Sequence, residues 1–461
     1  MVSSLCILWS LLPAALVHAL QTSLEGQEVL NAPFVSAEQN GILRRFRIDN
    51  LHERDVTTIL DQAENAGADV WQVTHKHMDV FIPRSQQLSR FAPHTYELSY
   101  TDTIIPPSSL YPNATQESLK PWNLSSLSNS TFHAGYHQLS DIDRFIVEMA
   151  DLYPDLVNIV NIGHSAEGRE MFALEISKDK TFQMHGNNTG HDLGKKVGFL
   201  VTGAQHAREW IATSTALYIA HALVAESSER HSLSSLLNYF NFYIILVPNP
   251  DGYVYTWEQD RFWYKSRQNV GPNEKCVGID MNRNWGHKWK PVAKFPLQVQ
   301  KKKPQPPTDA CSHWYPGHRA FESPEVNFIA NYVTTLGGLQ AYVDLRSYGQ
   351  MLSAPFSYSC KQAPKDAENQ IEAAMGAARA IKEVHGTVFT TGRLCEMLYR
   401  APGNVVDYMY AKAGIKYSYA AHLRDTGTYG FAIPPEWIRP VGEETVNLVR
   451  SLASFISNRK F

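Results

Sequence analysis

The sequence VGFLVTGAQHAREW, residues 197–210, joins an apolar run that predicts a buried strand to an apolar-periodic segment, 211–225, that predicts a helix. His206 and Glu209 lie at this junction. Side chains three positions apart share one face of a helix, so the two can point at a common centre. An imidazole and a carboxylate form a donor pair that suits zinc. Such a pair also occurs by chance at the exposed start of a helix, and the rest of the chain decides between these interpretations.

Outward from this junction, apolar strand candidates alternate with helical segments over residues 132–461. This alternation is typical of one α/β domain with a mixed, mostly parallel central sheet flanked by helices. Sites in such sheets gather at the carboxyl ends of strands, where His206, Arg346 and His422 all fall. The expected strands are 157–162, 171–176, 197–202, 240–247, 341–345 and 415–421, and the expected helices are 139–151, 209–225, 323–335, 368–385, 404–412 and 443–457.

A small α+β unit precedes this domain, within residues 20–105. Residues 42–48, 70–73 and 78–82 predict strands, and 53–66 predict an amphipathic helix. His75 and His77 could be metal ligands, but their polar turn favours solvated side chains. Residues 106–131 are rich in Pro and Ser and have little apolar periodicity, which predicts an exposed linker open to proteases.

The N-terminus and the cysteines indicate the secretory pathway. An apolar run over residues 5–17, too short to span a bilayer, leads to Val17-His18-Ala19, which fits a cleavage site, so we expect a signal peptide at 1–19 rather than a buried helix. Without it four cysteines remain. They allow three pairings, of which sequence proximity favours Cys276 with Cys311 and Cys360 with Cys395. Glycosylation sequons occur at Asn113, Asn123, Asn129 and Asn187.

The charge balance gives no reason to expect a nucleic acid partner, because 42 Lys and Arg residues face 45 Asp and Glu residues. No run after the signal approaches twenty apolar residues, so we expect no transmembrane segment.

Five motifs together resemble the pancreatic A/B-type zinc carboxypeptidases in order and spacing, over essentially all of residues 132–461. The unit at 41–100 resembles the inhibitory pro-domain of that family. Several motifs in one order are more specific than any one of them. The motifs are HAREW (206–210), NPDGY (249–253), DMNRNW (280–285), SY (347–348) and LRDTGTYG (423–430).

The resemblance implies a role for each matching position. His206 and Glu209 match two ligands of a His2Glu zinc set. Asn282 and Arg283 match the pair that binds the substrate's terminal carboxylate, for which a guanidinium is well shaped. Tyr399 matches a mobile tyrosine that closes over the substrate. The remaining substrate-contact positions are Arg208, Arg261, Ser347, Tyr348 and Val406, and the aliphatic Val406 implies an apolar side-chain pocket.

Three departures from the family fall on the chemistry. Arg346 stands where the third zinc ligand is expected, and an arginine cannot lose its proton to ligate a metal. We therefore expect weakened zinc binding and an Arg346–Glu209 ion pair in the metal's place. His422 replaces the glutamate general base, whose contribution is about 100-fold to 10,000-fold. Tyr264 replaces the oxyanion arginine, and losing one such donor costs about 100-fold to 1,000-fold.

The combination predicts an inactive metallocarboxypeptidase homologue that still recognises C-terminal carboxylates of peptides or proteins and also contacts its own pro-domain. It is most similar to the fungal inactive carboxypeptidase-like proteins, which implies a secreted or vacuolar protein linked to cell wall organisation. One alternative is an active zinc carboxypeptidase that releases apolar C-terminal residues. Another is weak structural zinc held by His206, Glu209 and His422. The Lys- and Pro-rich loop 288–309 is expected to be solvated, or else to bind an acidic partner.

Overall fold

The computed structural model describes residues 40–66, 68–83, 98–105, 122–178, 196–272, 274–292 and 308–461. The expected signal peptide, the sequons at Asn113 and Asn187, residues 106–121 of the expected linker and most of the basic loop lie outside the described residues.

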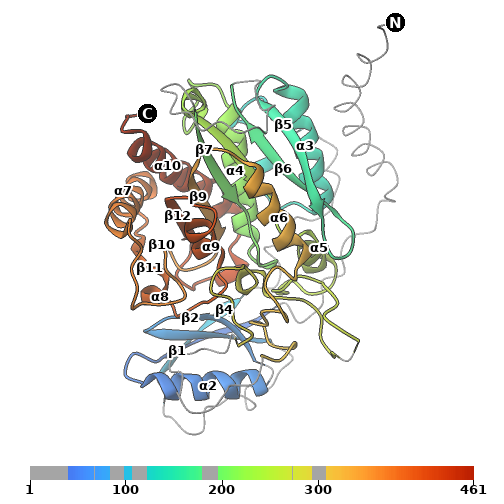
Figure 1. Ribbon diagram of the computed structural model, residues 1–461, viewed down its shortest axis with the longest axis vertical. Helices are drawn as coiled ribbons and strands as arrows, with labels where there is room; N and C mark the ends of the chain where they lie inside the picture. The colour runs from blue at the N-terminus through green and yellow to red at the C-terminus, as the bar shows by residue number, and fades with distance from the viewer. Residues whose placement is uncertain are drawn as a thin grey trace, which may run out of the picture.

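The large domain is built on one eight-stranded sheet (Figure 1). Its strands are β5 (Val157–His164), β6 (Glu170–Ile176), β7 (Val197–Thr202), β8 (Phe240–Ile245), β9 (Leu339–Arg346), β10 (Met351–Ala354), β11 (Thr390–Arg393) and β12 (Tyr417–His422). They lie in the order β11-β10-β12-β9-β7-β8-β6-β5. Four neighbouring pairs are parallel and three are antiparallel, so the predicted mixed, mostly parallel sheet is confirmed.

Helices cover both faces of this sheet because successive strand residues point to opposite sides. In β7, Phe199 and Val201 pack into one core and Leu200 into the other. The first core is shared with α3 (Leu139–Leu152), α4 (Trp210–Val224), α5 (Pro250–Glu258), α7 (Ala367–His385) and α10 (Ile438–Ser457). The second is shared with α6 (Pro324–Thr335), α8 (Leu394–Met397) and α9 (Val405–Ala411). No helix in the described ranges is long and apolar enough to cross a membrane.

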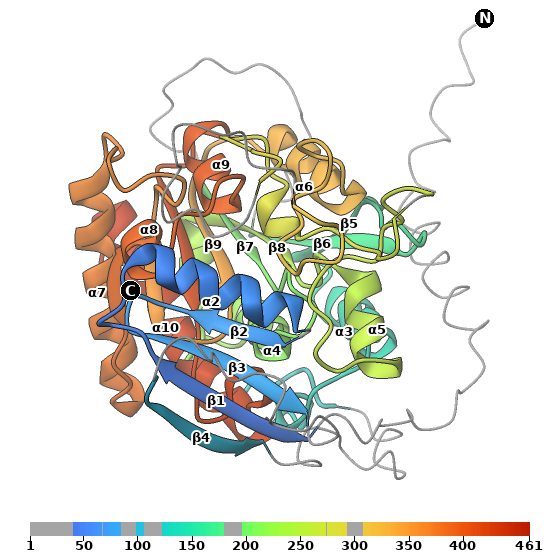
Figure 2. The same cartoon turned by 90° about the horizontal axis from the view of Figure 1, so that it is seen from below.

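The small unit is an antiparallel sheet with a helix on one face. Its elements are β1 (Gly41–Arg47), α2 (Glu53–Asn65), β2 (Asp69–Val73), β3 (His77–Pro83) and β4 (Tyr100–Ile105), with strand order β2-β3-β1-β4. Ile59, Leu60, Met78 and Val80 fill the core between helix and sheet. Figure 2 shows α2 on the outer side of the sheet. The opposite face of the sheet therefore lies against the large domain.

The end of the expected linker packs more than its composition predicts. Trp122, Leu124 and Leu127 are buried in the large domain's core. Glu229 accepts hydrogen bonds from the backbone N–H groups of residues 127 and 128, at 3.3 and 2.9 Å. The sequons at Asn123 and Asn129 lie in this segment with both asparagines exposed. Residues 122–131 are therefore packed rather than an exposed linker. Composition did not predict this because the residues that hold the segment, such as Glu229, are distant in the sequence.

Both disulfides join the cysteines that sequence proximity favoured. Cys276 pairs with Cys311 and Cys360 pairs with Cys395.

Candidate functional site

Three neighbouring parallel strands end at one point and bring together the residues predicted for a metal centre. β7 runs into His206 and Glu209, β9 ends at Arg346 and β12 ends at His422. His422 and Arg346 are direct partners in the parallel ladder. Gly203 allows the close turn after β7, since a Cβ there would lie 2.1 Å from the carbonyl oxygen of Leu246. The sheet topology therefore builds the site from residues far apart in the sequence.

Arg346 makes the predicted ion pair with Glu209. Its Nε donates to Glu209 Oε2 at 2.8 Å, and its Nη2 donates to Glu209 Oε1 at 3.0 Å. Burial alone would raise the pKa of Glu209, but the charge of Arg346 and the hydrogen bonds that it donates lower that pKa to about 2. The pKa of Arg346 is raised well above its usual value by Glu209, against the effect of burial. Both side chains are therefore charged at any physiological pH.

The same guanidinium contacts His206. Arg346 Nη2 donates to His206 Nδ1, and His206 Nε2 donates to Asp280 Oδ1 at 2.8 Å. One neutral tautomer, with its proton on Nε2, satisfies both bonds. His206 Nδ1 and Glu209 Oε1 lie 3.1 Å apart because they share one donor. Asp344 Oδ2 accepts from Arg346 Nη1 at 3.5 Å, so a second carboxylate faces the same cation.

This arrangement does not fit zinc. The atoms that would bind a metal, His206 Nδ1 and the two Glu209 oxygens, all accept hydrogen bonds from Arg346. A guanidinium keeps its proton, so it cannot take a place in the ligand set. In the described part of the chain, no three His, Cys, Asp or Glu side chains are grouped to hold a metal ion. Arg346 thus supplies an internal positive charge where a dication is expected.

Tyr264 and His422 line the same cavity as Arg346. The Tyr264 ring stacks on the His206 ring with centroids 3.7 Å apart, at the position where the resemblance led us to expect an arginine. His422 is buried, and its Nδ1 has no hydrogen-bond partner among the described residues. Burial, with the charge of Arg346 next, lowers the pKa of His422 to about 3, so its imidazole is neutral.

A second buried arginine, Arg283, contacts Tyr399, which lines the same cavity as Arg346. Arg283 Nη2 donates to the hydroxyl oxygen of Tyr399 at 2.9 Å. Asp280 is the one carboxylate within 4 Å of Arg283 among the described residues, with Oδ2 3.9 Å from Nε. Asn282 Oδ1 accepts from the backbone N–H of Val405 at 3.0 Å, which holds the start of α9 beside Arg283. The predicted carboxylate-binding pair and the predicted mobile tyrosine are thus together.

Two predicted contact residues lie behind the cleft. Arg261 is fully buried, and it donates to the carbonyl oxygens of Arg208 at 3.0 Å and Phe431 at 2.8 Å. Its guanidinium lies 3.7 Å from the centre of the Trp210 ring. Val406 is buried in the second core. Neither lines the cavity of about 60 Å³ beside Arg346. Arg261 supports its wall through Arg208 and Phe431, whereas Val406 is part of the core.

Strand β2 of the small unit lies over the cleft. Val70 to Val73 line the cavity together with Arg208, Tyr264, Arg346 and Tyr399. Arg208 Nη1 donates to both carboxylate oxygens of Asp69 at 2.9 Å. Trp71 packs against Phe262 and Phe431, with ring centroids 4.9 and 5.0 Å away. The predicted contact residue Arg208 is therefore held by the small unit.

Tyr348 is held in the same way. Its hydroxyl donates to Asp79 Oδ2 at 2.6 Å, and its carbonyl oxygen accepts from Gln72 Nε2 at 2.7 Å. The fully buried Asp79 also pairs with Arg45 through two bonds of 2.7 Å, and Arg45 donates to the carbonyl oxygen of Thr426. Ser347 contributes its backbone N–H to Glu209 Oε2 at 3.3 Å.

Sequence reasoning missed Asp280, Asp344 and Asp69 as site residues. Asp344 had a signal, because it lies two positions before Arg346 on a strand and so points to the same face. Asp280 was visible only as the first residue of a motif, and Asp69 contacts Arg208 across 139 positions.

The comparisons with known proteins agree with this geometry. The sequence model of the family described as Zinc carboxypeptidase matches residues 142–448. Inactive metallocarboxypeptidase ECM14 of Ajellomyces dermatitidis is 31% identical, with 92% of this chain and 74% of the relative covered. Metallocarboxypeptidase A-like protein of Trichophyton verrucosum is 32% identical, with 92% and 95% covered. The crystal structure of thrombin activatable fibrinolysis inhibitor superimposes with a TM-score of 0.76 and 27% identity, covering 91% of this chain and 99% of that one.

Proposed function

The chain belongs to the zinc carboxypeptidase family, and we propose that it is a non-catalytic member that binds the C-termini of peptides or proteins. Relatives named inactive metallocarboxypeptidases support its place among the inactive homologues. Arg346, His422 and Tyr264 stand at the positions of the third ligand, the general base and the oxyanion donor. The hydrolytic chemistry of the family needs all three.

The observation that carries the proposal is the state of Arg283. Its guanidinium is buried, and among the described residues its closest hydrogen-bond partner is the hydroxyl of Tyr399 and its nearest carboxylate is 3.9 Å away. A buried cation is stabilised by a close anion, and a terminal carboxylate supplies one with two oxygens. A carboxylate that replaced the Tyr399 hydroxyl on Nη2 would give Arg283 a full counter-charge. A preference for an apolar last side chain rests on the resemblance alone, because Val406 lies in the second core and does not line the cavity.

The small unit fits the role of a pro-domain that covers this cleft. Asp69 and Trp71 hold strand β2 over Arg208, so a ligand longer than its last residue meets β2. Release or displacement of β2 would open the cleft to a peptide.

The compartment is a further part of the proposal. Two disulfides fit an extracellular or secretory protein. The exposed Asn123 and Asn129 sequons support glycosylation there. The vacuole as destination and a role in cell wall organisation rest on the resemblance. Growth of a deletion strain on a cell-wall-damaging dye tests the cell wall role.

Isothermal titration with matched peptides tests the binding function. The peptides share an apolar last residue, and one set carries a free carboxylate while the other is amidated. We expect binding of the free acid, at least about tenfold tighter than the amide, since the amide lacks the charge that Arg283 recognises. Equal affinity for acid and amide, or no binding after β2 is displaced by an Asp69→Ala, Trp71→Ala variant, would refute the proposal.

A further inference from the structure

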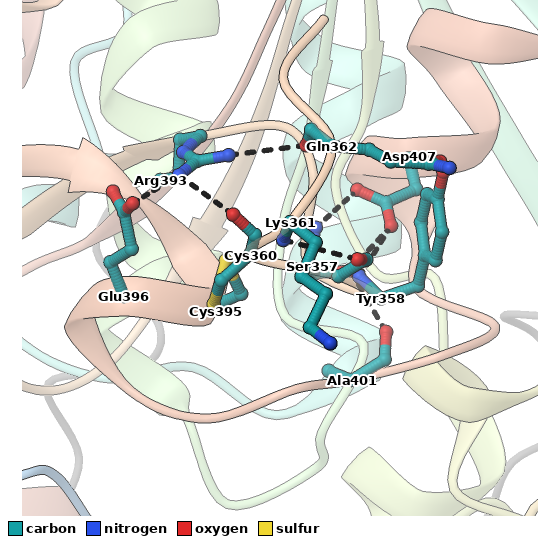
Figure 3. The surroundings of a disulfide bond; sticks show 11 residues. Ser357, Tyr358, Cys360, Lys361, Gln362, Arg393, Cys395, Glu396, Ala401 and Asp407 are labelled. Carbon is teal, nitrogen blue, oxygen red and sulfur yellow. Dashed lines mark hydrogen bonds and ion pairs between the residues drawn. A yellow bond between two sulfur atoms is a disulfide. The ribbon is translucent and has the colours of Figure 1, made fainter.

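The segment that carries Tyr399 is a loop, Leu398–Asn404, between α8 and α9. The loop leaves α8, which the Cys360–Cys395 disulfide joins to the segment after β10 (Figure 3). Arg393, just before α8, donates to the carbonyl oxygens of Cys360 and Gln362, each at 3.1 Å. The first end of the loop is therefore fixed.

The other end of the loop is pressed against Arg283 itself. Gly403 has a positive φ of 74°, and a Cβ at this position would lie 2.2 Å from the carbonyl oxygen of Arg283. The carbonyl oxygen of Gly403 accepts from the backbone N–H of Trp285 at 3.0 Å. Only glycine allows this approach, so this end of the loop lies directly against the backbone of Arg283.

The middle of the loop is held by a buried pair that does not reach the cleft. Ala401 exchanges two hydrogen bonds with Ser357: its N–H donates to Ser357 O at 2.9 Å, and Ser357 Oγ donates to its carbonyl oxygen at 2.8 Å. Asp407 Oδ1 accepts from Ser357 N at 2.8 Å, and Oδ2 lies 2.7 Å from Ser357 Oγ. Figure 3 shows Asp407, Ser357 and Ala401 in this order.

We propose that Asp407 and Ser357 are positioning residues that hold Tyr399 against Arg283 through Ala401. Both are fully buried and neither lines the cavity, so the bonds between Ser357 and Ala401 are their route to Tyr399. Ala401 is two residues from Tyr399, which leaves little freedom between the anchor and the tyrosine. This inference rests on the proposed function for its consequence in binding, but the position of Tyr399 can be measured without any ligand.

The test uses the full chain with 3-fluorotyrosine at position 399 alone, observed by fluorine NMR. Arg283→Ala gives the signal of a Tyr399 that has lost its hydrogen bond to Arg283. We expect Asp407→Ala and Ser357→Ala to move the wild-type signal toward that reference. Ser418→Ala is the matched control, since Ser418 is equally buried and its hydroxyl donates to the carbonyl oxygen of Ile415, outside the loop. It should leave the signal in place.

Signals at the wild-type position in both Asp407→Ala and Ser357→Ala would overturn the proposal, and Ser357→Ala decides alone if Asp407→Ala fails to fold. In peptide titrations Ser357→Ala should strengthen binding by up to about tenfold, because the carboxylate then displaces a loosened Tyr399 hydroxyl from Arg283, while Ser418→Ala leaves the affinity unchanged. If Arg283→Ala binds peptide as well as wild type, the binding function is wrong, whereas the fluorine signal still judges the positioning role.

Discussion

Arg346 lines the cavity and Arg283 contacts the cavity residue Tyr399; both arginines are buried, but their partners differ. Arg346 has Glu209 at 2.8 and 3.0 Å, so its charge is matched within the protein. Arg283 has a neutral hydroxyl at 2.9 Å and its nearest carboxylate at 3.9 Å, so its charge is only partly matched. A matched cation replaces a metal and binds nothing further. A partly matched cation is available to an anionic ligand, and this difference separates the lost chemistry from the retained recognition.

Removing the partner of Arg346 should have the largest effect. Glu209→Gln leaves the buried cation with only the more distant Asp344 carboxylate, and breaking a buried pair typically costs about 3–5 kcal/mol of unfolding free energy. Urea unfolding followed by tryptophan fluorescence measures this. The double variant Glu209→Leu, Arg346→Met removes both charges and should stay close to wild type. A loss below about 1 kcal/mol for Glu209→Gln, the range of exposed pairs, would show that the pair is not buried as described.

Removing Arg283 should affect binding and leave the Arg346 end intact. Losing one partner of a buried charge pair costs about 2–5 kcal/mol, so Arg283→Ala should weaken peptide binding by about 30-fold or more. Titration calorimetry measures the loss. Arg379→Ala, on the exposed side of α7, is the matched control and should bind normally. A loss as large in Arg379→Ala would mean that net charge alone drives binding.

Loosening the small unit should have a smaller and opposite effect. Asp69→Ala removes the carboxylate that holds Arg208, so β2 competes less well with a peptide. We expect peptide affinity to rise by up to about tenfold, which corresponds to about 1.4 kcal/mol. Asp49→Ala is the control, because Asp49 pairs with Arg47 inside the small unit. Unchanged affinity in Asp69→Ala would show that β2 does not limit access.

Local patterns predicted the elements whose signals are local. The apolar runs of β7 and β9 and the periodicity of α7 and α10 placed these elements within a few residues, although α10 begins five positions earlier than expected. β10 and β11 were missed because each has four residues, and β11 reads Thr-Thr-Gly-Arg. α5 was missed because Pro250 and Gly252, which lie at its start, are residues typical of a loop or β-turn.

The site divides in the same way. Strand ends and the charges on Arg346 and Glu209 were enough to predict their ion pair. Asp69 and Arg208 are 139 positions apart in the sequence, and Asp79 and Tyr348 are 269 positions apart. No local sequence pattern encodes contacts between residues so far apart. Arg261 carries the family's residue type, yet its burial beneath Trp210 depends on packing that a motif does not describe.

Metal analysis of the purified protein and of an Arg346→His variant tests the central claim most directly. Arg346 donates hydrogen bonds to the atoms that would bind zinc. Wild type should therefore carry no stoichiometric zinc after dialysis against a buffer that contains zinc. Arg346→His restores a His2Glu donor set and should gain about one zinc per chain. One zinc per wild-type chain, lost on His206→Ala, would contradict the claim that Arg346 has taken the metal's place.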